Sequence, residues 1–293
     1  MTDDPFVAHR SLLFTVSYEL LGSAADAEDV VQETWLRWAA LGARARVEVR
    51  DPRAYLVRIV TRQALNRLRT LSRRREEYVG EWLPEPLLTS PDVAEDVELA
   101  ESVSFAMLTV LETLGPVERA VFVLREVFET PYDEIAATVG RSPATVRQIA
   151  HRAREHVAAR RPRVRVSRAE QETVVARFLA AVRGGDLRGL LEVLAPDVVV
   201  VSDGGGVVAA ARRPIGGAHR VAALLGGLAT LAGDFAVRPV WLNGGPAARF
   251  DVGGVLDTVA ALVIEDGRVT RVYAVRNPQK LARLGEEASL SRA

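Results

Sequence analysis

Apolar and polar residues recur with a helical period along most of the first 168 residues. Over residues 25–40 the apolar positions follow one another at intervals of three and four, while acidic side chains share another face. A second amphipathic helix is predicted at about 52–70, because Asp51 suits the N-cap and Pro52 the first helical position. This part of the chain is therefore predicted to be all-α.

Residues 113–160 carry the pattern of a helix-turn-helix. A short helix with apolar Ile135 and Val139 ends at Gly140, and Ser142 is placed to cap the longer helix that follows. That longer helix keeps several polar residues off its apolar face, where they could contact the DNA major groove. These polar residues are Arg147, Gln148, His151 and Arg152.

The pattern changes after residue 168, where valine, alanine and glycine become frequent. Seventeen of the 22 glycines lie beyond residue 169, which marks a domain boundary there. Helices are predicted at 169–183, 186–194 and 217–231. Strands are predicted at 197–201, 235–242, 246–251, 255–264 and 268–276. Helices followed by a curved antiparallel sheet indicate an α+β cone.

Composition excludes several classes of function. The 293 residues include no cysteine, which excludes a disulfide scaffold, thiol catalysis and cysteine-ligated zinc. The four histidines do not form a metal-ligand pattern, so we expect neither a metal nor a cofactor. No apolar run approaches the ~20 residues that span a bilayer, and we expect a soluble, cytoplasmic protein without a membrane partner.

The net charge is zero, but the charges are segregated along the chain. Residues 44–75 contain 11 arginines and two acidic residues, whereas residues 76–118 contain 11 acidic residues and no base. A second basic block follows at 141–168. Two basic patches on either side of an acidic segment are typical of a bipartite polyanion binder. The alternative is that the arginines of both blocks lie on solvated helix faces and bind no polyanion.

Residues 26–37, Asp-Ala-Glu-Asp-Val-Val-Gln-Glu-Thr-Trp-Leu-Arg, closely resemble region 2.2 of bacterial RNA polymerase sigma factors of the extracytoplasmic-function type. The resemblance implies that this helix binds the clamp helices of the largest polymerase subunit. The matching positions are Asp26, Asp29, Gln32, Glu33 and Leu36. Residues 52–75 resemble regions 2.3 and 2.4, which open the −10 promoter element and capture flipped bases. The base-reading positions are Arg62, Gln63, Asn66 and Arg67.

The helix-turn-helix resembles region 4 of the same family, whose last helix reads the −35 element. The resemblance implies that Arg147, Gln148, His151 and Arg152 contact this DNA. The expected partners are promoter DNA and core RNA polymerase, the latter bound through its clamp helices and flap.

Three short motifs extend the resemblance to the sigma subgroup that carries a C-terminal SnoaL-like domain. They are Trp82-Leu83-Pro84-Glu85-Pro86, Asp203-Gly204-Gly205-Gly206 and Asn277-Pro278-Gln279-Lys280-Leu281. The resemblance implies that this domain regulates the sigma core in cis, so no separate anti-sigma factor is expected. The candidate regulatory residues are Trp82, Leu83, Pro84, Asp203, Gly204, Gly205, Asn277 and Pro278. Val207 stands where the family often has a lysine, so the role of that lysine does not carry over.

These matches predict a multidomain chain and an alternative sigma factor. The predicted parts are region 2 at 1–78, a linker at 79–105, region 4 at 106–165, the SnoaL-like cone at 168–285 and a tail at 286–293. Two alternatives remain open: a one-component regulator with a ligand-sensing cone, and a SnoaL-like enzyme with vestigial helices. Because Asp203 lies beside three glycines, it favours a turn or a contact surface, and we expect no catalytic residue.

Overall fold

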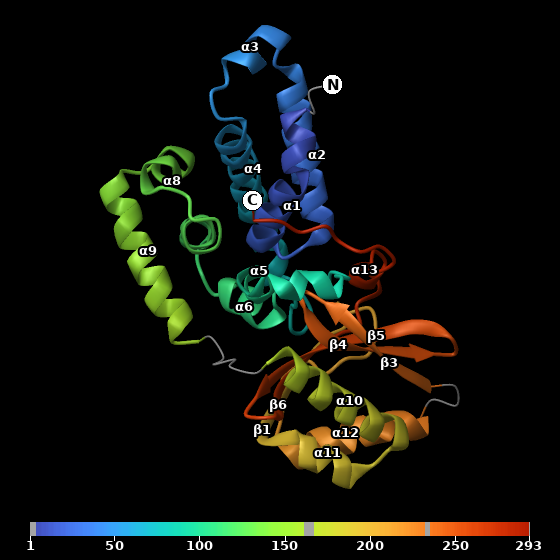
Figure 1. Ribbon diagram of the computed structural model, residues 1–293. Coiled ribbons are helices and arrows are strands. Elements are labelled where there is room, and N and C mark those ends of the chain that lie inside the picture. Colours follow the sequence, from blue (N-terminus) through green and yellow to red (C-terminus); the bar gives the residue numbers. More distant parts are fainter. Residues whose placement is uncertain (1–3, 161–166, 232–234, 293) are drawn as a thin grey trace.

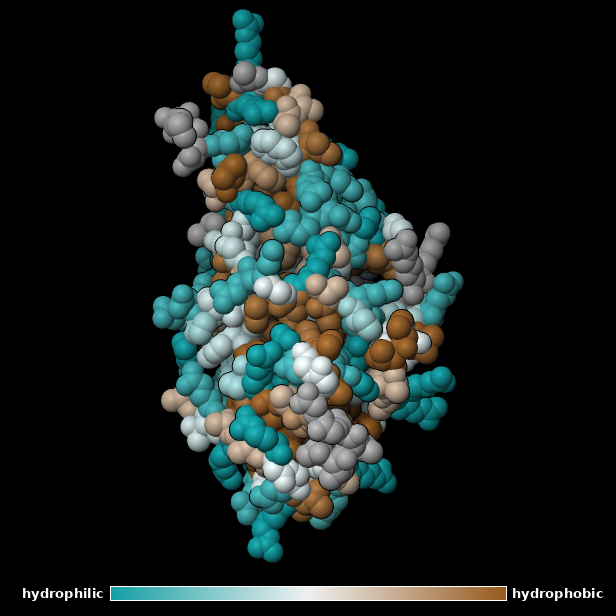
Figure 2. All heavy atoms as spheres, turned by 90° about the vertical axis from the view of Figure 1, so that its right-hand side faces the viewer, coloured by the Kyte–Doolittle hydropathy of each residue, from teal (hydrophilic) through white to brown (hydrophobic). Residues whose placement is uncertain are grey.

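The computed structural model describes residues 4–160, 167–231 and 235–292. Helices form the upper part of the molecule and a mixed sheet with its own helices forms the lower part (Figure 1). No helix in the described ranges is long and apolar enough to cross a membrane. On the face shown in Figure 2, hydrophilic residues cover much of the upper part, and hydrophobic residues gather near the middle.

The first helical part is a bundle around α1, which is buried continuously from Leu12 to Leu21. Asp4 caps α1 and Gly22 ends it in the left-handed conformation, with φ 64°. Because this stretch is buried on all sides, polar Glu19 included, it has no amphipathic period, which is why the sequence pattern did not single it out. The helices are α1 (Pro5–Leu21), α2 (Ala24–Ala40), α3 (Ala43–Glu48) and α4 (Pro52–Glu76).

The second helical part contains the helix-turn-helix and shares one continuous apolar core with the first. Leu13 of α1 and Val60 of α4 belong to the same buried cluster as Val121 and Ala150. The helical elements here are η1 (Pro91–Glu95), α5 (Val97–Ser102), α6 (Phe105–Leu111), α7 (Pro116–Phe122), a π-helical turn η2 (Val123–Val127), α8 (Tyr132–Val139) and α9 (Pro143–Ala158). The two helical parts therefore form one packed unit in this conformation.

The C-terminal domain contains a six-stranded sheet in the order β2-β1-β6-β5-β4-β3. Its helices are α10 (Arg168–Gly184), α11 (Leu187–Val193), α12 (Ala218–Leu231) and α13 (Pro278–Leu281). Its strands are β1 (Leu194–Asp203), β2 (Ile215–Gly216), β3 (Phe235–Leu242), β4 (Gly245–Val252), β5 (Val255–Glu265) and β6 (Arg268–Val275). The predicted α+β class is confirmed, as are all three helices and all five strands predicted here.

The sheet is mixed, so the prediction of a wholly antiparallel sheet was wrong. β1 pairs with β6 in parallel, while the other neighbours are antiparallel. Strands β3 to β6 form a meander, and its last strand returns alongside β1 in the same direction. A parallel pair needs a long connection, which α12 and the meander supply.

Both faces of this sheet are covered. One face packs against α10, α11 and α12, where Phe178, Val221 and Phe250 fill the interior of the cone. The opposite face packs against Leu83 from the segment after α4 and Phe105 from α6. The connection between the two helical parts is thus built into the second core of the C-terminal domain.

The segment predicted as a tail runs back from α13 onto the first helical bundle, and its last described residues lie beside α1 and α4 in Figure 1. Ser289 Oγ lies 2.9 Å from Ser11 Oγ, and Ser291 N donates to Thr15 Oγ1 at 3.0 Å. Arg292 Nε lies 3.0 Å from Asp96 Oδ2. These contacts tie the last described residues to α1 and to the residue that caps α5.

A buried acidic residue, Glu19, lies where α1, α5 and α7 meet. Its carboxylate accepts a hydrogen bond from Ser102 Oγ at 2.7 Å, and Arg119 Nε donates to Glu19 O at 3.0 Å. Glu19 Oε2 and Arg119 Nη2 are buried without a partner among the described residues. Burial raises the pKa of Glu19 to about 8, and burial lowers the pKa of Arg119 to about 9.

The raised pKa of Glu19 predicts a pH-dependent stability. The folded chain holds this proton more tightly than the unfolded chain, whose carboxyl titrates near 4.5, so the free energy of unfolding falls as pH rises from 4.5 to about 8. The neutral isostere Glu19→Gln is expected to flatten that part of the profile, measured by urea denaturation across this range. Exposed Glu192→Gln serves as the control. The same slope in the wild type and Glu19→Gln would contradict the prediction.

Candidate functional site

The outer face of α2 presents the residues predicted to bind core polymerase. Ser23 caps this helix by accepting a hydrogen bond from Asp26 N at 3.2 Å. Asp26 is half-buried, and the other predicted residues are exposed: Asp29, Gln32, Glu33 and Leu36. The Leu36 side chain is 66% exposed, which is high for a leucine beside a well-packed helix face.

The residues predicted to read the −10 element lie on α4, and two of them bond to the neighbouring face of α2. Arg67 Nη2 lies 2.6 Å from Asp26 Oδ1 and 3.0 Å from Asp29 Oδ2. Gln63, which is buried, donates from Nε2 to Glu33 Oε2 at 2.8 Å. The hydrogen bond to Asp26 is the largest cause of a raised pKa of Arg67. The two predicted surfaces are therefore joined to each other by charge-assisted bonds.

Another predicted −10 residue, Arg62, contacts the second helical part. Its Nη2 donates to Ala137 O at 2.6 Å and its Nε donates to Thr138 O at 3.1 Å, both near the C-terminal end of α8. A guanidinium suits these carbonyls, because the last carbonyls of a helix carry partial negative charge. Asn66 is exposed on the same helix and accepts from Arg69 Nη1 at 3.1 Å. In this conformation α8 thus covers part of the predicted base-reading surface.

Helix α9 presents its predicted DNA-reading face to the outside, on the flank of the molecule away from α2 (Figure 1). Ser142 caps it by accepting from Thr145 N at 3.2 Å. Its inner residues Val146, Ala150 and Ala153 are buried. All four predicted −35 residues are exposed: Arg147, Gln148, His151 and Arg152. This surface is open to a ligand in the conformation seen here.

A buried carboxylate at the end of β1 joins the C-terminal domain to the segment after α4. Asp203 is fully buried; its Oδ1 accepts from Tyr78 Oη at 2.7 Å and its Oδ2 from Leu83 N at 2.9 Å. Lys280 Nζ lies 2.7 Å from Asp203 Oδ2, donates to Leu83 O and sits 4.2 Å from the centre of the Trp82 ring. Burial and the bond to Asp203 raise the pKa of Tyr78, which remains a donor.

The glycines after Asp203 allow the close approach of α13. A Cβ on Gly205 would lie 2.3 Å from Asn277 Nδ2, and one on Gly204 would lie 2.5 Å from Val208 O. Asn277 caps α13 by accepting from Gln279 N at 3.0 Å, and its Nδ2 donates to Tyr78 Oη at 2.9 Å. Pro278 is the first residue of α13.

The same segment also contacts the first helical bundle. The Trp82 ring lies over Gly22, where a Cβ would be 2.8 Å from it, and Pro84 is buried. Glu85 Oε2 accepts from Ser23 Oγ at 3.0 Å and from Ala25 N at 3.2 Å, at the start of α2. The structure therefore brings all eight predicted regulatory residues to one junction between the bundle and the C-terminal domain.

Sequence reasoning missed Lys280, although the sequence contained a signal. It is the only lysine among 38 basic residues, and all the others are arginine. A compact ammonium fits between the Asp203 carboxylate, the Leu83 carbonyl and the Trp82 ring, where a planar guanidinium would not. Lys280 lies in the third motif, Asn277–Leu281, and is not the lysine that the family often has at the position of Val207.

Asn243 was also missed, because Asn-Gly at a hairpin turn is an ordinary turn signal. It is buried at the β3–β4 turn with φ 52°. Its Nδ2 donates to Tyr18 Oη at 2.7 Å and to Val103 O at 2.8 Å, while its Oδ1 accepts from Leu87 N at 2.9 Å. One amide thus joins α1, the end of α5 and the connecting segment.

Comparison with known proteins identifies the class. Residues 6–74 match the family model of sigma-70 region 2, and residues 104–157 match that of sigma-70 region 4. The chain is therefore an RNA polymerase sigma factor, which directs transcription initiation at promoters. A one-component regulator would leave the region 2 match unexplained.

The similarity extends over almost the whole chain. The chain is 36% identical over 290 residues to ECF RNA polymerase sigma factor SigJ of Mycobacterium tuberculosis, and the match covers 94% of this chain and 91% of that protein. It is also 36% identical over 285 residues to the probable ECF sigma factor SigI of the same species, covering 96% and 94%. The SigJ crystal structure matches with a TM-score of 0.77, covering 95% of this chain and 98% of that chain. The chain belongs to the family of ECF RNA polymerase sigma factors, as its motifs predicted.

The junction geometry predicts that Lys280→Arg is not a conservative change. A guanidinium cannot occupy the space of the ammonium, so residues 78–90 are expected to exchange backbone amide hydrogens at least about tenfold faster, measured by hydrogen–deuterium exchange mass spectrometry. The matched control is exposed Arg283→Lys, close by in sequence. Equal protection of Leu83 in the wild type and Lys280→Arg would contradict this role of Lys280.

Proposed function

We propose that this sigma factor binds core polymerase through the outer face of α2, opens the −10 element with α4 and holds the −35 element with α9. We further propose that its C-terminal domain sets the placement of α4 and α9 in cis. The Asp203 junction is the observation that carries this proposal. It fixes the segment that leads from the −10 helix to the −35 helix.

The contacts of α4 support a closed conformation that must open before promoter melting. Arg62 is bonded to α8, and Gln63 and Arg67 are bonded to α2. A single strand can be captured only if these donors exchange their present partners for phosphates and bases. Since a half-exposed ion pair contributes little net free energy, the exchange is energetically accessible for Arg67.

The C-terminal domain fits a regulatory role better than a catalytic one. The carboxylate of Asp203 is used by Tyr78, Leu83 and Lys280, and the carboxylate of Asp251 lies 2.8 Å from Arg249 Nη2 on β4. Side chains fill the interior of the cone, where a substrate would sit. We therefore propose that the domain replaces a separate anti-sigma factor and carries no catalytic residue.

Asp29→Arg tests the polymerase-binding surface. Reversing this exposed charge is expected to weaken binding to core polymerase by about a hundredfold or more, because like charges across an interface cost several kcal/mol. Binding is measured by fluorescence anisotropy with labelled sigma factor. Exposed Glu192→Arg on α11 carries the same charge change far from α2 and is expected to bind normally. Normal binding by Asp29→Arg would overturn the assignment of α2.

Run-off transcription with core polymerase tests regulation in cis. The DNA upstream of the gene for this chain supplies the candidate promoter. Because a loosened junction lowers the cost of opening, Lys280→Arg is expected to raise the specific transcript about threefold or more over the wild type at equal occupancy of core. Arg283→Lys is the control. Transcript from Lys280→Arg at or below the wild-type level would contradict control through this junction.

A further inference from the structure

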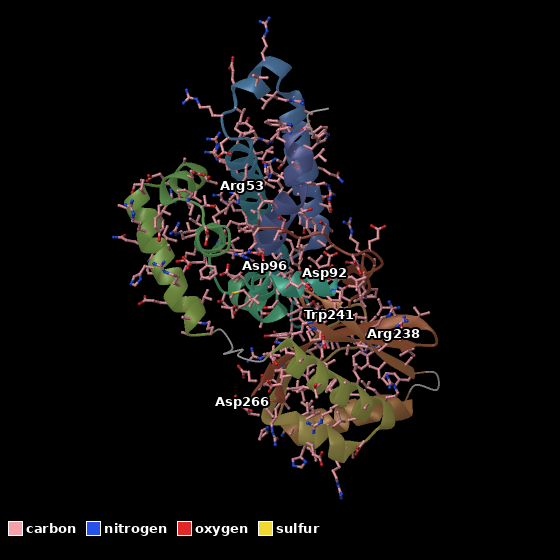
Figure 3. All side chains as sticks on the ribbon, in the orientation of Figure 1. Arg53, Asp92, Asp96, Arg238, Trp241 and Asp266 are labelled. Atoms are coloured by element: carbon pink, nitrogen blue, oxygen red, sulfur yellow. The ribbon has the colours of Figure 1, made fainter. Side chains whose placement is uncertain are left out.

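The outer face of the C-terminal sheet borders a cavity of about 500 Å³. Its walls come from strands β3 to β6, from α5 and α6, and from the first turn of α10. Figure 3 shows Trp241 at this place, between the sheet and the helices above it. The cavity lies on the opposite side of the sheet from the cone interior, which Phe178 and Phe250 fill.

The cavity is lined mainly by aromatic and aliphatic side chains, and its polar members include Glu101, Ser104 and Gln171 as well as Arg168. The rings of Phe105 and Tyr273 are stacked with their centroids 6.0 Å apart and their planes 24° apart. Met107, Val263 and the ring of Trp241 complete the apolar wall. Its volume lies within the range of about 300–1,000 Å³ that small-molecule sites occupy, and such sites commonly lie between domains.

The positively charged side chain of Arg168 lies at one side of this apolar wall. The Arg168 guanidinium lies over the Trp241 ring, 4.7 Å from its centre. Its Nε bonds to Glu172 Oε1 at 3.1 Å, and both side chains of that pair are about half exposed. An exposed pair four residues apart on a helix is worth little, so a ligand carboxylate can take the place of Glu172. Arg168 Nη1 donates to Pro91 O at 3.3 Å, so a flat acid would bind through two hydrogen bonds along the Nε and Nη2 edge of the guanidinium.

We propose that this cavity binds a small, flat aromatic carboxylic acid. The ligand's rings lie against Trp241 and the half-buried Pro246 and Ala261, and its carboxylate lies on Arg168. The walls include the first helix of region 4 as well as the C-terminal sheet, so the ligand contacts both. Binding therefore stabilises the packing of α6 on the sheet by mass action. The existence of this site does not depend on the proposed direction of regulation.

The test uses the full-length chain and the probe 1-anilinonaphthalene-8-sulfonate, a flat aromatic anion whose fluorescence rises in apolar sites. Three variants are compared with the wild type. Ala261→Phe fills the cavity from β5, and Arg168→Gln removes the cation. Arg177→Gln makes the same change at an exposed position further along α10, outside the cavity lining. Urea denaturation checks that each variant folds. If Ala261→Phe does not fold, Arg168→Gln still tests the site, because Arg168 is exposed and its substitution does not disturb the core.

The expected result is saturable binding of one probe per chain. Affinity is expected to fall about tenfold or more in Ala261→Phe and about threefold or more in Arg168→Gln, with no change in Arg177→Gln. Salicylate and 2-naphthoate are expected to displace the probe, whereas uncharged naphthalene methanol displaces it less well. Absence of saturable binding overturns the proposal. So does an affinity that Arg168→Gln leaves unchanged.

Discussion

The buried carboxylate of Asp203 is the interaction on which the arrangement of this chain depends. A fully buried charge is costly unless cations and hydrogen-bond donors surround it. Here the donors come from two distant parts of the sequence, Tyr78 and Leu83 after α4 and Lys280 on α13, and from Gly205 in the adjoining turn. Removing any one part leaves the charge incompletely satisfied. The junction therefore depends on this placement of Tyr78 and Leu83 against the carboxylate.

Because of that junction, the acidic segment between the two helical parts is packed into the fold and is not an extended linker. In an extended linker, side chains face water and domains move independently. Here Leu83 and Leu87 are buried, Thr89 N bonds to Trp241 O at 3.1 Å, and Asn243 binds the segment from the other side. The connection is an element of the core. Any movement of α9 relative to α4 must therefore work against contacts made with the C-terminal domain.

In this conformation, arginine side chains of α4 find their hydrogen-bond acceptors within the chain. Arginines that the sequence marks as DNA ligands bond instead to carboxylates of α2 and carbonyls of α8, as Arg67 and Arg62 do. Phosphates and bases offer equivalent acceptors, so such bonds can be exchanged without leaving a buried group unpaired. The exposed face of α9 needs no such exchange. The structure thus distinguishes the proposed −35 surface, which is exposed, from the proposed −10 surface, which is partly covered.

The sequence by itself determined the elements and the family. Helical periods, caps such as Ser142 and the turn at Gly140 act between residues close along the chain, so α2, α4 and α9 could be predicted, and for α9 the exposed face as well. On α4 the predicted base-reading residue Gln63 is buried. The order of helices and strands after residue 168 predicted the α+β class in the same way. Motifs of a dozen residues sufficed for region 2 and region 4.

Only the tertiary structure decided which distant groups meet. Nothing local shows that Lys280 pairs with Asp203, that Arg62 reaches α8, or that Asn243 joins three segments. The parallel pairing of β1 with β6 and the return of residues 286–292 onto α1 were likewise invisible, since both depend on long-range packing. From Leu12 to Leu21, α1 lacked an amphipathic period because its neighbours bury it from all sides. Local chemistry fixes an element, while burial and partner choice depend on the whole fold.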